Sequence, residues 1–262
     1  MNQHRPRKRF GQHFLVDTAL VDQLVRTIAP AAGDCLVEIG PGEGVLTRAL
    51  LDRVAHLHLV ELDRDLIEGL SRTIAPERAT IHSADALRFD FRALAPPGGD
   101  LRVVGNLPYN ISTPLLFHLL EQAEVIRDMH FMLQKEVVER LVAGPESPRR
   151  GRLSVMIQYH CQVDYLLDVP PGAFRPPPRV NSAVVRLSPH RNLPCPAEDY
   201  GMFVAVVRQA FTQRRKTIRN ALKSWLNGTQ IEAAGVDPGV RPDRLELSDF
   251  VALADMATRG DA

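Results

Sequence analysis

Three glycines that directly follow a short apolar segment constrain the fold of this chain more than any other feature. Residues 35–39 read CLVEI, the next five read GPGEG, and the helical pattern VLTRALLDRV follows. Glycine allows a tight turn and a close approach of the main chain to a ligand, and the first N–H groups of the next helix face the same space. Gly40, Gly42 and Gly44 therefore predict a strand–loop–helix unit that binds a small molecule.

Short apolar runs alternate with helical patterns along the first half of the chain. Further strands are expected at residues 56–62, 79–83, 102–106 and 129–134. Helices are expected at residues 18–28 (behind the N-cap Asp17), 45–54, 65–74, 114–123 and 135–143. This alternation predicts βαβ units, and therefore an α/β fold with a doubly wound, mostly parallel, Rossmann-like sheet.

Proline and glycine interrupt this alternation after residue 143. GPESPRRGR (144–152) predicts a surface loop, and the proline-rich residues 170–180 lead into an edge or antiparallel strand at 182–187. A linker is expected at 188–199, followed by helices at 200–211, 215–226 and 247–257. The sequence therefore predicts an α/β domain over residues 1–188 and a small C-terminal helical domain over residues 189–262.

The composition excludes several classes of protein. No window approaches the ~18 consecutive apolar residues of a membrane helix, and no apolar stretch of a signal peptide follows the basic N-terminus. Cys35, Cys161 and Cys195 are isolated and odd in number, which argues against a disulfide framework and a thiolate zinc site. The nine histidines form no HExxH pair. We therefore expect a cytoplasmic protein that uses no metal.

The net charge of +1 conceals an uneven distribution of charge along the chain. Residues 1–16 carry four basic groups and no acid, whereas residues 17–140 carry 12 basic and 19 acidic groups. Residues 141–262 carry 16 basic and 12 acidic groups, with no acid between Asp199 and Glu232. A solvated helix face would explain one such cluster, but several basic segments around an acidic middle favour binding of a polyanion by one face.

Three carboxylates are placed to bind a nucleotide-like cofactor. Glu61 ends the strand that follows the glycine loop, where a carboxylate can accept both hydroxyls of a ribose. Alone, this pattern also fits nicotinamide enzymes. Glu38 precedes the glycines, where a cationic end of the ligand would lie, and Asp85 follows the next strand, where it can accept an adenine amino group. These two residues favour S-adenosylmethionine as the cofactor.

The segment NLPY, formed by Asn106, Leu107, Pro108 and Tyr109, follows a predicted strand. The exocyclic amine of a base is a poor nucleophile because its lone pair is delocalised into the ring. The Asn106 oxygen and a main-chain carbonyl of Leu107 or Pro108 would bind both N–H hydrogens and localise that lone pair. Pro108 fixes the turn, and Tyr109 offers a face for a flipped base. The segment therefore predicts methyl transfer to a base amine, which depends on positioning more than on a general base.

Together these segments resemble the small-subunit ribosomal RNA adenine dimethyltransferase family, especially its bacterial 16S branch. The resemblance covers nearly the whole chain and is carried by RKRFGQHFL (7–15), VEIGPGEGVLT (37–47), VELDRDL (60–66), GNLPYNISTPLLFHLL (105–120), HFMLQKEVVERLVAG (130–144), GRLSVMIQY (151–159), FRPPPRVNSAVVRL (174–187) and FTQRRKTIRNAL (211–222). It implies methylation, twice each, of N6 of two adjacent adenosines in a hairpin near the 3′ end of 16S rRNA. The expected substrate is the immature 30S subunit, and the expected state of the enzyme is a monomer.

The resemblance also implies roles for individual residues. His13 stands where the family often has asparagine, and Phe174 matches an aromatic residue that would sandwich the base opposite Tyr109; otherwise Phe174 would be a core residue. Implied cofactor contacts are His13, Leu15, Gly40, Glu61, Asp85 and Asn106. The basic segments are expected to contact RNA phosphates. At the N-terminus these are Arg7, Lys8 and Arg9, for which a disordered tail is the alternative. In the small C-terminal helical domain they are Arg214, Arg215, Lys216 and Arg219, which would make it an RNA-binding domain.

Three alternatives share part of this pattern. A large-subunit rRNA adenine methylase of the macrolide-resistance type shares the fold and an NxPY turn, but the segments at 174–187 and 211–222 fit the small-subunit branch better. DNA adenine methylases usually carry NPPY or DPPY and an inserted recognition region. A non-catalytic 30S assembly factor would not need the intact NLPY turn.

Overall fold

The computed structural model describes residues 13–260, which form two compact units. The first, the α/β unit, comprises the described residues up to Val138 together with Asp164–Pro189. The second, the helical unit, comprises Glu139–Val163 together with the described residues from His190 onward. The compact units thus differ from a single division at residue 188, because residues 139–163 group with the C-terminal helices.

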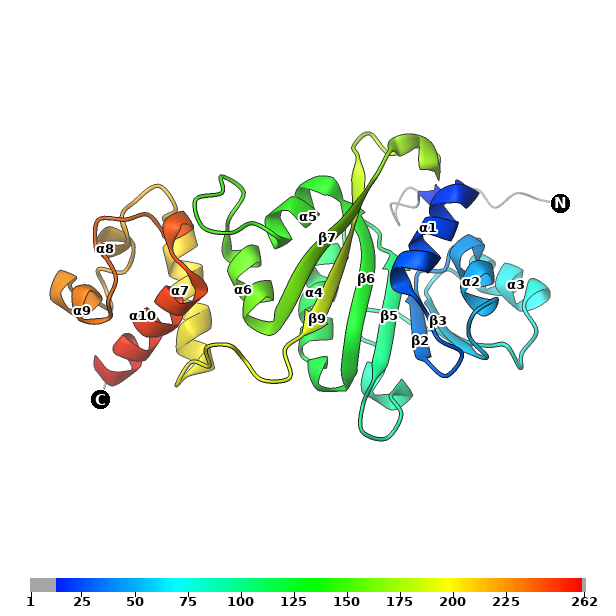
Figure 1. Ribbon diagram of the computed structural model, residues 1–262, viewed down its shortest axis with the longest axis horizontal. Helices are drawn as coiled ribbons and strands as arrows, with labels where there is room; N and C mark the ends of the chain where they lie inside the picture. The colour runs from blue at the N-terminus through cyan, green and yellow to red at the C-terminus, as the bar shows by residue number, and fades with distance from the viewer. Residues whose placement is uncertain (1–12, 261–262) are drawn as a thin grey trace. The chain divides into compact units, whose positions relative to one another are not determined.

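A seven-stranded sheet with the strand order β4-β3-β2-β5-β6-β9-β7 forms the centre of the α/β unit (Figure 1). The strands are β2 (Cys35–Ile39), β3 (Leu57–Glu61), β4 (Ala79–Ser83), β5 (Leu101–Asn106), β6 (Ile126–Gln134), β7 (Cys161–Val169) and β9 (Ser182–Pro189). Strands β4, β3, β2, β5 and β6 pair in parallel, and β9 runs antiparallel to β6. The predicted mostly parallel α/β sheet is confirmed, and β9 is an interior antiparallel strand rather than an edge.

Helices pack against this sheet where the apolar periodicity predicts them. They are α1 (Thr18–Ile28), α2 (Val45–Leu51), α3 (Arg64–Thr73), α4 (Ser112–Leu120) and α5 (Lys135–Leu141), the last of which continues into the helical unit. The predicted N-cap is confirmed, because the Asp17 carboxylate accepts the main-chain N–H of Leu20 at 3.1 Å. Leu24 of α1, Leu50 of α2 and Leu59 of β3 belong to one buried cluster, which fixes these helices on one face of the sheet.

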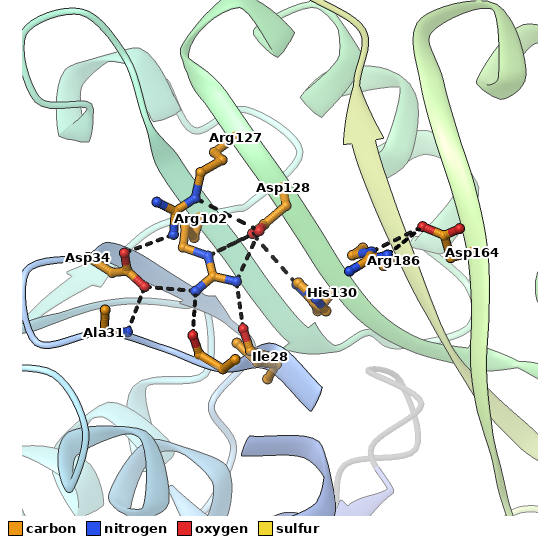
Figure 2. Close-up of polar contacts among 10 residues, drawn as sticks. Ile28, Ala31, Asp34, Arg102, Arg127, Asp128, His130, Asp164 and Arg186 are labelled. Atoms are coloured by element: carbon orange, nitrogen blue, oxygen red, sulfur yellow. Dashed lines mark hydrogen bonds and ion pairs between the residues drawn. The ribbon is translucent and has the colours of Figure 1, made fainter. Parts of the chain in front are cut away.

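The polar groups at the amino ends of the central strands are joined in one buried network (Figure 2). Arg102, near the start of β5, donates to Asp34 at 2.7 Å and to Asp128 at 2.9 Å. Its other amino group donates to the carbonyl of Ile28, at the C-terminal end of α1, at 2.6 Å. This network anchors α1, β5 and β6 at the end of the sheet away from the glycine loop.

The helical unit contains α6 (Arg152–His160), α7 (Tyr200–Thr212), α8 (Ile218–Ala221), α9 (Gly228–Ala233) and α10 (Leu247–Gly260). Helix α7 packs against α6 and α10. The helix expected at 215–226 is much shorter, because it begins after the N-cap Thr217 and ends at Ala221. None of the described helices is both long and apolar enough to cross a membrane.

Arg150 explains why the segment at 144–152, expected on the surface, belongs to the helical unit. This side chain is 1% exposed, although it lies in a stretch of glycine, proline and charge. Its guanidinium donates to the carbonyls of Ala143 and Leu245, each at 2.9 Å, and to Gln158 at 3.2 Å. These bonds satisfy carbonyls at two loop ends and hold the segment against the C-terminal helices.

Candidate functional site

A cavity of about 200 Å³ opens at the carboxyl ends of the parallel strands. Its walls come from the segments that follow β2, β3, β4 and β5 and from the chain just before α1. This edge is where open α/β sheets bind ligands. Nine of the residues singled out from the sequence line it: His13, Gly40, Gly42, Glu61, Asp85, Asn106, Leu107, Pro108 and Tyr109.

The glycine loop adopts backbone angles that favour glycine. Gly40 and Gly42 have φ values of 66° and 58°, and a Cβ on Gly42 would lie 3.0 Å from the Phe14 ring. Gly44 has a structural role instead. It is the N-cap of α2, and a Cβ there would lie 2.8 Å from Leu70 Cδ2. Gly44 thus allows α2 and α3 to pack, whereas Gly40 and Gly42 line the cavity.

Glu61 is a buried carboxylate held by main-chain donors. It is 8% exposed, and its Oε1 accepts the N–H groups of Leu62 at 2.8 Å and Asp63 at 2.9 Å. Burial raises the pKa of Glu61, and these two bonds, with a third from the Gly42 N–H, oppose that shift. A carboxylate offers about four lone-pair positions. Glu61 can therefore still accept a hydroxyl donor from a ligand in the cavity.

Asp85 follows β4 on the same wall of the cavity. Its Oδ1 accepts the Leu87 N–H at 3.0 Å, which fixes the direction of the carboxylate. Leu62, which lines the same cavity, is 51% exposed although it is a large apolar residue. A cavity that holds both an exposed leucine and a fixed acceptor suits a flat, partly apolar ligand with an amino group at its edge.

Glu38 lies beside the glycine loop but outside the larger cavity. It lines an adjoining space of about 30 Å³ with Leu15, Gly40 and Asn106. The carboxylate is 2% exposed and accepts the Thr47 hydroxyl at 2.6 Å. Burial raises the pKa of Glu38 to about 7, against the Thr47 bond and with a contribution from the charge of Glu61. If Glu38 contacts the ligand as expected, it does so from this smaller space and not from the larger cavity.

The NLPY turn is held by segments that are distant in sequence. The Asn106 amide nitrogen donates to the His13 carbonyl at 2.9 Å, which directs its Oδ1 away from that carbonyl. The Tyr109 hydroxyl bonds with the Ser182 hydroxyl at 2.7 Å. The Leu107 N–H donates to Met132 in β6 at 3.2 Å. Burial raises the pKa of Tyr109, which therefore carries a neutral phenol at physiological pH.

Phe174 does not face the cavity. It is 3% exposed, belongs to the buried cluster under α1, and is absent from the lining of both cavities. Its strand, β8 (Phe174–Arg175), pairs antiparallel with β1 (Phe14–Leu15). This position fits the alternative expectation, in which Phe174 is a core residue. To stack on a base, its ring would have to leave the core. Through this pairing, Phe174 fixes the chain that carries His13.

The basic residues expected to bind RNA are only partly described. Arg7, Lys8 and Arg9 lie outside the described residues. Arg215, Lys216 and Arg219 are exposed, and they lie in the turn between α7 and α8 and on α8 rather than on one long helix. Arg214 is half-buried, donates to the Pro148 carbonyl and lies 3.9 Å from Asp243. Arg214 therefore also anchors the segment before α6.

Sequence reasoning missed part of the cavity wall. Leu62, Leu66 and Leu87 line it but were not singled out; their only signal is proximity to Glu61 and Asp85. Gly105 was also missed, although a Cβ there would lie 2.5 Å from the Ile39 carbonyl. A glycine inside a predicted strand indicates such a close approach of two backbones.

The chain resembles known proteins over nearly its whole length. A family model for ribosomal RNA adenine dimethylase matches residues 3–259. The protein named ribosomal RNA small subunit methyltransferase A of Alcanivorax borkumensis is 63% identical over 98% of this chain and 92% of its own length.

Two solved structures share the fold. A dimethyladenosine transferase from Plasmodium falciparum superimposes with a TM-score of 0.79 at 24% identity, over 92% of this chain and 96% of that one. The 23S rRNA methyltransferase ErmE gives a TM-score of 0.74 at 25% identity, over 94% of this chain and 99% of that one. The extent of the family match and the identity to the Alcanivorax protein together establish that this chain belongs to the ribosomal RNA adenine dimethylase family.

Proposed function

We propose that this protein transfers methyl groups from S-adenosylmethionine to N6 of two adjacent adenosines near the 3′ end of 16S rRNA, within the immature 30S subunit. The observation that carries the proposal is that the NLPY turn and the acidic residues Glu61 and Asp85 line one cavity. In this proposal, a nucleotide-binding half and an amine-binding half share that one cavity. Membership of the dimethylase family supports the reaction type.

The residues present fit S-adenosylmethionine. Glu61 retains acceptor capacity for ribose hydroxyls, and Asp85 can accept the adenine amino group beside the exposed Leu62. Glu38 and the glycine loop line the adjoining space, where a cationic ammonium group would favour the charged form of the Glu38 carboxylate. When bound, the cofactor supplies an activated methyl group on a sulfonium.

The target amine is held by two acceptors on the NLPY turn. The His13 carbonyl occupies the Asn106 NH₂ group, so the amide presents Oδ1 as an acceptor. The Pro108 carbonyl accepts the Ile111 N–H at 3.1 Å, so we assign the second acceptor to the Leu107 carbonyl. Bonds from both N–H groups of the amine localise its lone pair toward the methyl donor, while the Tyr109 ring stacks on the extruded base. Orientation supplies the rate enhancement.

The RNA is expected to contact exposed basic residues of the helical unit. Arg215, Lys216 and Arg219 are exposed in a stretch that contains no acid between Asp199 and Glu232. Phosphate contacts of this kind carry most of the affinity for RNA, and shape carries most of the selection of a folded ribosomal site. We further propose that the enzyme acts as a monomer in the cytoplasm, where the assembling subunit is found.

The main alternative is methylation of large-subunit rRNA. The match to the small-subunit protein of Alcanivorax, at 63% identity, is much stronger than the 25% identity to the 23S enzyme. A purely structural role in assembly would leave the orientation of Asn106 and the retained cavity without a use. Both observations favour the small-subunit enzyme.

Methyl transfer from labelled S-adenosylmethionine to unmethylated small subunits tests the proposal, with large-subunit rRNA assayed in parallel. Mass spectrometry should find N6,N6-dimethyladenosine in small-subunit RNA. Asn106→Ala should abolish the product without weakening cofactor binding more than a few-fold, and Asn192→Ala, at an exposed linker position, serves as the matched control. Label confined to large-subunit rRNA would favour the alternative enzyme. Subunit binding without any transfer would overturn the catalytic proposal.

A further inference from the structure

His13 contacts both halves of the amine-binding turn. Its main-chain carbonyl accepts the Asn106 amide at 2.9 Å. Its imidazole stacks on the Tyr109 ring, with ring centroids 5.8 Å apart and an angle of 30° between the planes. Both residues line the larger cavity. One residue thus touches the side chain expected to bind the amine and the side chain expected to stack on the base.

The imidazole of His13 is itself held in place. Its Nδ1 lies 2.7 Å from the Pro176 carbonyl, a group that can only accept, so Nδ1 carries the hydrogen and donates it. The next residue, Phe14, pairs with Arg175 in the short β1–β8 sheet. Two contacts with one segment therefore fix both the main chain and the ring of His13. A ring anchored in this way is a fixed support for Tyr109 rather than a gate that swings over it.

The Tyr109 ring is then restrained from two sides. Its hydroxyl bonds with Ser182 at 2.7 Å, which restrains the tip, and the imidazole contacts the ring itself. A hydroxyl bond alone leaves the ring free to rotate about the line through its tip. A packed aromatic neighbour removes that freedom, and such pairs prefer the offset-stacked geometry seen here.

We propose that the His13 side chain is a positioning residue for the base-binding side of the site: anchored on the Pro176 carbonyl, it fixes the plane of Tyr109 against which the target base stacks. This deepens the proposed function, on which its kinetic consequence rests, and it gives the imidazole a positioning role on the base-binding side of the cavity. Loss of the ring should therefore slow turnover while leaving the affinity for the cofactor product, S-adenosylhomocysteine, nearly unchanged.

A fluorine NMR experiment tests the contact without any need for activity. The chain contains four tyrosines, so 3-fluorotyrosine labelling gives a small set of resonances, and Tyr109→Phe identifies the one from Tyr109. His13→Asn keeps a side-chain donor for Pro176 but removes the ring, and should shift or broaden the Tyr109 resonance. His13→Phe keeps a ring and should preserve more of the wild-type environment. An unchanged Tyr109 resonance in His13→Asn would overturn the inference.

The matched control is His56→Asn. His56 also places Nδ1 near a main-chain carbonyl, that of Glu77 at 3.1 Å, but it is not among the residues that line the cavity. This variant should leave the Tyr109 resonance and the methylation rate unchanged. Thermal melting of each variant separates a loss of fold from a loss of position.

Kinetics on unmethylated small subunits complete the test. His13→Asn should lower kcat by roughly two- to twelvefold, the factor that one aromatic pair contributes, and His13→Phe should recover part of the loss. Titration calorimetry with S-adenosylhomocysteine should find an affinity within about threefold of wild type. A fall in that affinity as large as the fall in kcat would overturn the inference in favour of a cofactor contact. A wild-type protein without methyl transfer would refute the proposed function, while the fluorine experiment would still decide the role of His13.

Discussion

Replacing Arg102 by methionine should destabilise the α/β unit by about 3–5 kcal/mol, because the change removes the shared partner of two carboxylates that are largely shielded from water. The Arg102 side chain is 6% exposed, that of Asp34 is 8% exposed and that of Asp128 is 15% exposed. The contacts that Figure 2 draws among these three side chains are therefore little screened by water. The same change also removes the donor to the Ile28 carbonyl at the end of α1.

Urea and thermal unfolding followed by circular dichroism measure this loss. For a unit of this size, each kcal/mol shifts Tm by about 2–4 °C, so a fall of roughly 6–20 °C is expected. Arg72→Met is the matched control, because Arg72 pairs with Glu68 at a site where the side chains are 69% and 67% exposed. Its cost should stay below about 0.5 kcal/mol. A loss below about 1 kcal/mol in Arg102→Met would refute the reasoning.

A second substitution separates the buried charge from the lost packing. Adding Asp128→Leu to Arg102→Met should restore much of the stability, because the carboxylate left without its main partner is then gone. Asp34 needs no such repair, since Arg127 still donates to it at 2.8 Å. Failure of the double variant to regain stability would mean that packing, rather than the unpaired charge, accounts for the loss.

Three further predictions follow from the described contacts. Burial lowers the pKa of His130 to about 4 from its ordinary 6.5, so stability should fall as the pH drops from about 6.5 to 4, where the unfolded chain takes up a proton and the folded one does not. Chemical denaturation across this pH range should show that the free energy of unfolding falls by about 1–3 kcal/mol less in His130→Gln than in the wild type. An identical fall in both proteins would mean that His130 does not cause the pH dependence. Ser182→Ala and Tyr109→Phe should each lower kcat, and the double variant should show less than the product of the two effects because both remove one hydrogen bond; multiplicative effects would argue against a shared role. The double variant Arg215→Ala with Lys216→Ala should weaken RNA binding and reduce the slope of log affinity against log salt by roughly one per lost phosphate contact. Filter binding at several salt concentrations measures this slope, and an unchanged slope would mean that these two residues do not contact the RNA backbone.

Local signals in the sequence predicted the elements around the site well. The run CLVEI became β2 at the predicted residues, and ATIHS became β4 with the same bounds. Helix α1 begins directly after its predicted N-cap, Asp17. Each of these features depends on neighbouring residues, such as apolar periodicity or a cap within one turn. The carboxyl ends of the strands then carried Glu61, Asp85 and Asn106 to the same edge.

Features that depend on distant contacts escaped prediction. Strand β7 (Cys161–Val169) was not predicted, because its polar residues obscure the alternation of apolar and polar side chains. Its strand conformation depends instead on pairing with β9, which is distant in sequence from much of it. Arg150 sits in a loop-like sequence, and its burial follows from the Leu245 carbonyl, 95 residues away. Phe174 is a core residue because β8 pairs with β1, a register that no local pattern encodes. Such contacts are set by tertiary packing, which overrides local preference.

The same division between local and distant contacts bears on how the site works. In the proposed reaction the NLPY turn supplies the acceptors and the aromatic ring, and two of its side chains are oriented by contacts elsewhere in the chain. The Asn106 amide is oriented by His13, 93 residues earlier, and the Tyr109 hydroxyl by Ser182, 73 residues later. Because catalysis by positioning depends on small displacements, these two supports matter as much as the motif they hold. If the turn binds the amine as proposed, it can do so only after β1 and β9 have taken their places, and methyl transfer would then depend on the completed fold of the α/β unit.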